Sequence, residues 1–106
     1  MPKYLVQSSY TAEGIKGLQK DGAAGRLKMA TQVAESLGGK LEAIYFAFGE
    51  HDVVAILDLP SPVDAAAIAF AVSGTGMIRT KTTPLLTIED ADAALKKAVP
   101  FRAPGR

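Results

Sequence analysis

Large side chains alternate with small or polar ones from Tyr4 to Tyr10, and this period of two predicts a β-strand. Apolar residues at helical spacing then continue as far as Leu37, and Thr11 is suited to cap the first turn. Glycine costs a helix about 1 kcal/mol relative to alanine. Gly22, in the run Lys20-Asp21-Gly22, is therefore expected to break this region into two helical pieces.

Two apolar segments, residues 41–48 and 53–59, predict a β-hairpin with Gly49-Glu50-His51-Asp52 at its tip. Their apolar residues are consecutive rather than alternating, which indicates strands covered on both faces of the sheet. The only histidine, His51, is thus expected on a tight turn. If the turn has only a structural role, Gly49 is expected to adopt a positive φ and Asp52 to hydrogen-bond to the turn.

A second helix is predicted after Pro60, with Ser61 as its cap, Pro62 at its first position and Asp64 completing a variant of the capping box. Its interior, residues 65–72, is rich in alanine and almost wholly apolar. Such a helix is expected to pack closely on a sheet before the glycines of residues 73–76 end it.

The last predicted elements are a strand and a short helix. The strand begins near Met77 and is expected to be disrupted at Pro84, because proline cannot donate to a ladder. Thr87 is suited to cap a helix from Ile88 to Ala98. We predict one domain over residues 1–99 and a flexible tail over residues 100–106.

The order strand, helix, strand, strand, helix, strand predicts an α+β protein of the ferredoxin-like βαββαβ type. Its four-stranded antiparallel sheet would carry both main helices on one face, with the short C-terminal helix in addition. The apolar hairpin strands then leave an uncovered apolar face, which predicts a homo-oligomer formed through the sheet face. Alternatively, the terminal helix or a loop covers that face within the same chain.

Composition narrows the classes of partner. The chain has 106 residues, a formal net charge of +1 and no cysteine. A charge so near zero, with scattered basic residues, favours neither nucleic acid nor an anionic membrane as a partner. No apolar run approaches the roughly 20 residues that span a bilayer, and no leader pattern is evident, so a cytoplasmic protein is expected.

Several stretches of the chain resemble the GYD domain family. They are Pro2-Lys3-Tyr4-Leu5-Val6, Ser9-Tyr10-Thr11, Leu37-Gly38-Gly39-Lys40-Leu41-Glu42, Tyr45-Phe46-Ala47-Phe48-Gly49 and Thr82-Thr83-Pro84-Leu85-Leu86-Thr87. The resemblance covers residues 2 to about 90 and implies a ferredoxin-like domain of the dimeric α/β-barrel type. The signature for which the family is named reads Gly49-Glu50-His51-Asp52, with histidine where tyrosine is expected. No reaction is carried over from the resemblance.

The candidate catalytic residues are His51, Asp52 and Tyr10. An imidazole titrates near neutrality and binds transition metals or haem iron, and adjacent carboxylates are possible partners. A single histidine rarely makes a metal site, so no metal site is predicted unless symmetry-related subunits supply further ligands. The structural interpretation is that His51 is an amphipathic surface side chain in place of a tyrosine, and it is favoured because no second ligand lies nearby.

The candidate ligand-binding residues are Tyr10, Tyr45, Arg79 and Lys81, together with the polar positions Gln7, Ser8 and Ser9. Strands 4–10 and 77–83 are expected to be neighbours, so these side chains would converge on the sheet. Arginine or lysine would bind a carboxylate or enolate, and tyrosines offer hydroxyls on apolar bodies. The competing interpretation is that charges protect an outer strand from aggregation.

Two functions follow. The first is a homo-oligomeric binding domain that holds a small molecule or a protein partner in a cavity between sheet and helices. The second is a small enzyme of the dimeric α/β-barrel sort, an isomerase, monooxygenase or haem-dependent protein, that uses His51 or a tyrosine. The second rests on analogy of fold, which does not fix function. No cofactor is identified by the sequence.

Overall fold

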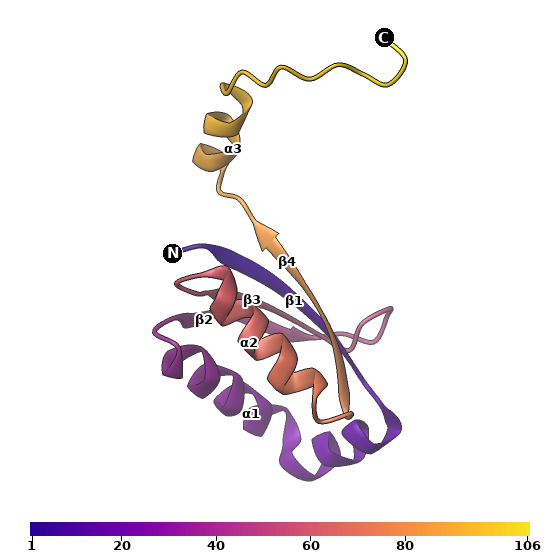
Figure 1. Cartoon of the computed structure of the whole chain (residues 1–106). Helices are drawn as coiled ribbons and strands as arrows, with labels where there is room; N and C mark the ends of the chain where they lie inside the picture. The colour runs from indigo at the N-terminus through magenta and orange to yellow at the C-terminus, as the bar shows by residue number, and fades with distance from the viewer.

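The computed structural model describes all 106 residues and contains a four-stranded sheet in the order β2-β3-β1-β4, with all neighbours antiparallel. Helices α1 and α2 lie on one face of this sheet, while α3 stands beyond its end (Figure 1). This is the predicted ferredoxin-like arrangement. The elements are β1 (Lys3–Tyr10), α1 (Ala12–Ser36), β2 (Lys40–Phe46), β3 (Val53–Asp58), α2 (Pro62–Ser73), β4 (Ile78–Leu85) and α3 (Ile88–Leu95).

Helix α1 begins and bends as the sequence predicts. The Thr11 hydroxyl accepts a hydrogen bond from the Gly14 backbone N–H at 3.2 Å. Gly22 has φ 77° and ψ 163°, a conformation open essentially to glycine alone, and it divides α1 into two helical pieces. Gly38, with φ 79°, ends the helix in the left-handed region. The kink sets the direction in which the second piece of α1 crosses the sheet.

The hairpin differs in detail from the prediction. Strand β2 ends at Phe46 rather than at residue 48, and the side chain of Phe48 is fully exposed. The loop is closed by the backbone N–H of Ala47, which donates to the Asp52 carbonyl oxygen at 2.8 Å. Gly49 does not have a positive φ, so the expected role for this glycine is wrong. The turn needs no left-handed residue because four residues separate the bonded pair.

Three further details differ from the prediction. Pro84 lies within β4 and pairs with Tyr4, because β4 is an edge strand whose outer side needs no N–H donor. The Ser61 side chain makes no bond to the α2 backbone and instead donates to the Asp64 carboxylate at 3.0 Å. Helix α3 ends at Leu95, three residues before the predicted Ala98.

The register divides the sheet into two unlike faces. Tyr4, Val6, Ser8 and Tyr10 of β1 point toward the helices, so the intervening residues point away from them. Away from the helices, Ala43, Ile56, Leu5 and Thr83 form one row across the four strands, and Tyr45, Val54, Gln7 and Lys81 form the next. We call the surface formed by these eight residues the open face.

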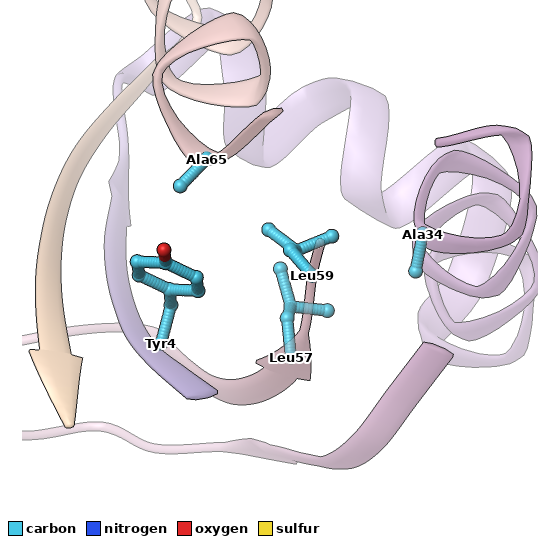
Figure 2. Packing of buried hydrophobic residues seen from close by; sticks show 5 residues of the cluster. All are labelled: Tyr4, Ala34, Leu57, Leu59 and Ala65. Atoms are coloured by element: carbon cyan, nitrogen blue, oxygen red, sulfur yellow. The ribbon is translucent and has the colours of Figure 1, made fainter. Parts of the chain in front are cut away.

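The core between sheet and helices is small. Its buried members are Tyr4, Leu57 and Leu59 from the sheet side, Ala34 from α1 and Ala65 from α2 (Figure 2). Only Leu59 among the large side chains is completely buried, and 9 of 106 residues are buried in all. The small alanines bring both helices close to the sheet at one end, so the layers are tightest there.

The alternative that the terminal helix covers the open face is not observed. Helix α3 has no buried residue. It follows β4 through the short link Leu86-Thr87 and lies beyond the sheet (Figure 1). The apolar open face is therefore uncovered in a single chain.

Candidate functional site

A cavity of about 340 Å³ lies between the two main helices and the sheet. Its floor is formed by β1, β2, β3 and the start of β4, and its walls by the second piece of α1 and by α2. Fourteen of the 17 lining residues are hydrophobic. The volume falls at the lower end of the roughly 300–1,000 Å³ usual for ligand pockets, so the space fits a small, mainly apolar molecule.

Few polar groups face this cavity. Arg26 from α1 is its only charged lining residue, and Tyr10 and Ser8 from β1 and Thr75 after α2 supply hydroxyls. The Ser8 hydroxyl is already within hydrogen-bond distance of Thr80 Oγ1, at 3.3 Å. Arg26 forms no ion pair, since all the ion pairs of the chain lie at the Lys3 end of the sheet. An unpaired, half-buried guanidinium beside an apolar cavity is suited to a ligand anion.

Arg26 was not among the residues that sequence reasoning selected. A usable signal was present, because Arg26 shares a helical stripe with Ala30 and Val33 at spacings of four and seven residues. A charge on the apolar stripe of a helix is a candidate for a polar group inside a pocket. Only the kink at Gly22 shows which stripe meets the sheet.

Asp52 has a clear structural role. Its carboxylate Oδ2 accepts a hydrogen bond from the Tyr10 backbone N–H at 2.8 Å, and its own N–H donates to the Ser8 carbonyl oxygen at 2.8 Å. The side chain thus extends the pairing of β1 and β3 beyond the last ladder residues. The expectation that Asp52 bonds within the turn is met only by its backbone carbonyl, whereas its carboxylate binds the neighbouring strand.

His51 is half-buried in the loop before β3 and is not among the residues that line the cavity. The structure contains no group of three or more histidine, aspartate or glutamate side chains arranged to hold a metal ion. Of the candidate catalytic residues, only Tyr10 therefore reaches the cavity through its side chain.

The four candidate ligand-binding residues do not converge, because the sheet separates them. Tyr10 pairs with Ile78 and faces the cavity. Tyr45 and Lys81 share a row on the open face. Arg79 is exposed on the edge strand. Since adjacent strand residues point to opposite faces, neighbouring sequence positions here belong to different surfaces.

Arg79 also borders a second hollow, of about 490 Å³, at the start of β4. Six residues line it and only one of them is hydrophobic. Apolar enclosure is what most ligand sites share, so we regard the smaller cavity under the helices as the better candidate despite its volume.

A cluster of charges joins three strands at the opposite end of the sheet from the hairpin loop. Lys3 Nζ lies 2.7 Å from Asp58 Oδ1 and 3.1 Å from Glu42 Oε1, and Lys40 Nζ lies 3.8 Å from Asp58 Oδ2. The hydrogen bond from Lys3 holds the pKa of Asp58 below its ordinary value of 3.8, although desolvation opposes it. Hydrogen bonds to Asp58 and then to Glu42 raise the pKa of Lys3 above 10.5. This cluster stabilises strand pairing and lies outside the cavity.

The sheet order and the two helices on one face define a ferredoxin-like α+β protein with an apolar cavity beneath its helices. A family model described as GYD domain matches residues 4–95, and the chain belongs to the GYD domain family. Comparisons with curated proteins and with solved structures gave no match. No helix is both long enough and apolar enough to traverse a bilayer.

Proposed function

We propose that this protein binds a small, mainly apolar carboxylate in the cavity between α1, α2 and the sheet, as part of a homo-oligomer whose subunits meet at the open face. The observation that carries the proposal is the single unpaired arginine, Arg26, on a cavity whose lining is otherwise apolar or hydroxylated. The apolar lining favours a hydrocarbon or aromatic body, and the guanidinium favours a planar anion that accepts two parallel hydrogen bonds.

The oligomer is supported by the two rows of the open face. The half-buried side chains of Leu5, Val54 and Ile56 form an apolar centre there, and Tyr45 is 71% exposed. Contiguous apolar surface that remains open to solvent marks interaction sites in soluble proteins. Light scattering at micromolar concentration tests this part of the proposal, and a stable monomer would contradict it.

Ligand binding is tested with octanoate and octanamide, which share a chain length and differ in charge. Calorimetric titration and thermal shift are expected to show tighter binding of octanoate. A hydrogen bond to a charged group is worth about 1.5–3 kcal/mol, which corresponds to roughly 10- to 150-fold in Kd. Specific binding also raises the melting temperature by mass action.

Two arginine variants locate the anion. Arg26→Met is expected to abolish the preference for octanoate while leaving the apolar lining intact. Arg79→Met is the matched control, because Arg79 is exposed on the edge strand and is not among the lining residues of the cavity. Equal binding of octanoate and octanamide by the unaltered protein, or loss of the preference in Arg79→Met alone, would refute the assignment to Arg26.

The second candidate function, a small enzyme, is favoured by the position of Tyr10 rather than by His51. The Tyr10 side chain lines the cavity and so offers a hydroxyl for proton transfer to a bound molecule. An absorbance spectrum and metal analysis of protein from its native cells test the haem- or metal-dependent form. Any activity found is expected to be lost in Tyr10→Phe and kept in His51→Ala. The reverse result would indicate that His51, and not Tyr10, is the catalytic residue.

A further inference from the structure

The C-terminal arm, which we define as residues 86–101, contains a regular helix that does not pack against the rest of the chain. Thr87 caps α3 by accepting a hydrogen bond from the Asp90 N–H at 3.0 Å, yet no residue of α3 is buried. The large apolar residues of the arm are all exposed by at least two thirds: Leu86, Ile88, Leu95, Val99 and Phe101. A short helix with an exposed apolar stripe gains its stability from packing rather than from propensity.

The chain is more extended than a compact domain of the same length. Its accessible surface is 7629 Å², whereas a compact monomer of this mass exposes roughly 5,700 Å². Its radius of gyration is 16.8 Å, against about 13 Å for a compact domain of this length. The excess of about 2,000 Å² is more than the roughly 800 Å² that each partner buries in a standard interface.

The arm and the open face are complementary. Ile88, Ala91 and Leu95 recur at spacings of three and four on one side of α3, which suits the apolar centre of the open face. The acidic residues of α3 are Glu89, Asp90 and Asp92, and the β4 side of the open face carries the basic residues Lys81 and, at its margin, Arg79. Acidic residues thus flank the apolar stripe of α3, and basic residues flank the apolar centre of the open face.

The sizes of the two surfaces also agree. Eight residues of α-helix span about 12 Å, and the four strands of the sheet, at 4.7–4.9 Å spacing, are roughly 14 Å wide between their outer axes. The link to α3 continues outward, since Thr87 is extended, with φ −70° and ψ 164°. The chain therefore presents the arm away from its own sheet (Figure 1).

We infer that the C-terminal arm of one copy lies across the open face of a second copy, which returns its own arm. This inference rests on the homo-oligomer of the proposed function and names the segment that covers the open face. In this arrangement the apolar stripe of α3 and the centre of the open face bury each other. It is independent of the ligand in the cavity, because the cavity lies on the other side of the sheet.

The absence of cysteine from the chain makes a clean cross-linking test possible. Leu95→Cys labels the arm, and Ile56→Cys labels the centre of the open face. Mixing the two single variants with a short bismaleimide is expected to give a heterodimer cross-linked between positions 95 and 56. Lys28→Cys, on α1 at the opposite side of the sheet, is the control and is not expected to cross-link to Leu95→Cys.

Two results would overturn the inference. In the double variant Leu95→Cys/Ile56→Cys, a cross-link within one chain and none in the mixture of single variants would mean that the arm folds back on its own sheet. A dimer that gives no 95-to-56 cross-link would mean that another surface, such as the partner's sheet, covers the open face. A stable monomer of the unaltered protein would refute the oligomer itself, so the two failures are distinguishable.

A charge on the arm provides a second readout. Leu95→Asp is expected to weaken dimerisation by roughly tenfold or more, since burying a leucine contributes about 1.5–3 kcal/mol. Leu95 is 82% exposed in the single chain, so the substitution leaves the fold of each subunit intact. Lys96→Asp is the control: it adds the same acidic side chain beside the stripe without removing an apolar one, so it is not expected to weaken dimerisation. Sedimentation showing equal dimer dissociation constants for Leu95→Asp and the unaltered protein would contradict the inference.

Discussion

Removal of the Asp52 carboxylate is expected to destabilise the sheet, although Asp52 itself does not line the cavity. The carboxylate accepts the Tyr10 backbone N–H at 2.8 Å in a partly buried position. In Asp52→Ala that N–H loses a charged acceptor, and such hydrogen bonds are worth about 1.5–3 kcal/mol. The variant therefore leaves a backbone donor without its partner at the end of β1, next to residues that line the cavity.

The corresponding shift in melting temperature follows from the length of the chain. Unfolding entropy is about 2.1 cal/mol/K per residue near 60 °C, so a loss of about 2 kcal/mol lowers the melting temperature by roughly 9 °C. Asp52→Asn keeps an oxygen acceptor but no charge, and we expect about half this effect, since neutral hydrogen bonds contribute about 1 kcal/mol. Thermal melts followed by circular dichroism, at one protein concentration for all variants, measure both shifts.

Glu50→Ala is the control, because Glu50 is exposed in the same loop and makes no hydrogen bond or ion pair through its side chain. Surface changes of this kind stay within about 0.5 kcal/mol. A melting temperature for Asp52→Ala equal to that of Glu50→Ala would refute the structural role given to the aspartate of the family signature. Equal effects of Asp52→Ala and Asp52→Asn would refute the role of its charge.

Three further predictions concern pH and glycine. Because the fold lowers the pKa of Asp58, the ionised carboxylate stabilises the folded state above pH 3.8, and this stabilisation is lost as pH falls through the lower folded pKa. Acid titration followed by circular dichroism is expected to show a smaller loss of stability in Asp58→Asn than in the unaltered protein. Gly14→Ala is expected to destabilise, since a Cβ there overlaps the Met77 carbonyl oxygen, whereas Gly17→Ala, with open space around it, stabilises by about 0.5–1 kcal/mol. Gly22→Ala is expected to cost about 1–3 kcal/mol through backbone strain. Urea denaturation measures the three glycine variants, and an equal response of Gly14→Ala and Gly17→Ala would contradict the close contact at Gly14.

The element order and most of the helix boundaries could be read from the chain because they depend on neighbouring residues. Thr11 caps α1 through a residue three positions away, and Gly22 bends it through its own φ and ψ. The prediction at Pro84 was wrong because the effect of a proline depends on distant residues. Whether a proline breaks a strand depends on which side of it is paired, and β4 proved to be an edge.

The candidate site was predicted only in part. The cavity lies where the sequence placed it, between sheet and helices, and Tyr10 lines it. Tyr45, Arg79 and Lys81 were grouped with Tyr10 because all are polar and lie on β-strands. The register instead puts Tyr45 and Lys81 on the open face. Which face a strand residue takes is fixed by parity within the sheet, and a shift of one residue reverses it.

The sequence by itself determined the family, the fold class and the excess of apolar residues that one small core cannot bury. Only the tertiary structure decided where that excess lies, in the open face and the C-terminal arm. It also decided that Arg26, fifty-two positions before Ile78 in the chain, lines the same cavity as Ile78 and Tyr10. Local patterns set the elements because their interactions span a few residues. Sites and interfaces depend on contacts between distant segments, and the hairpin with His51 shows the difference: its sequence identifies the family, and its structure assigns the Asp52 carboxylate to the neighbouring strand.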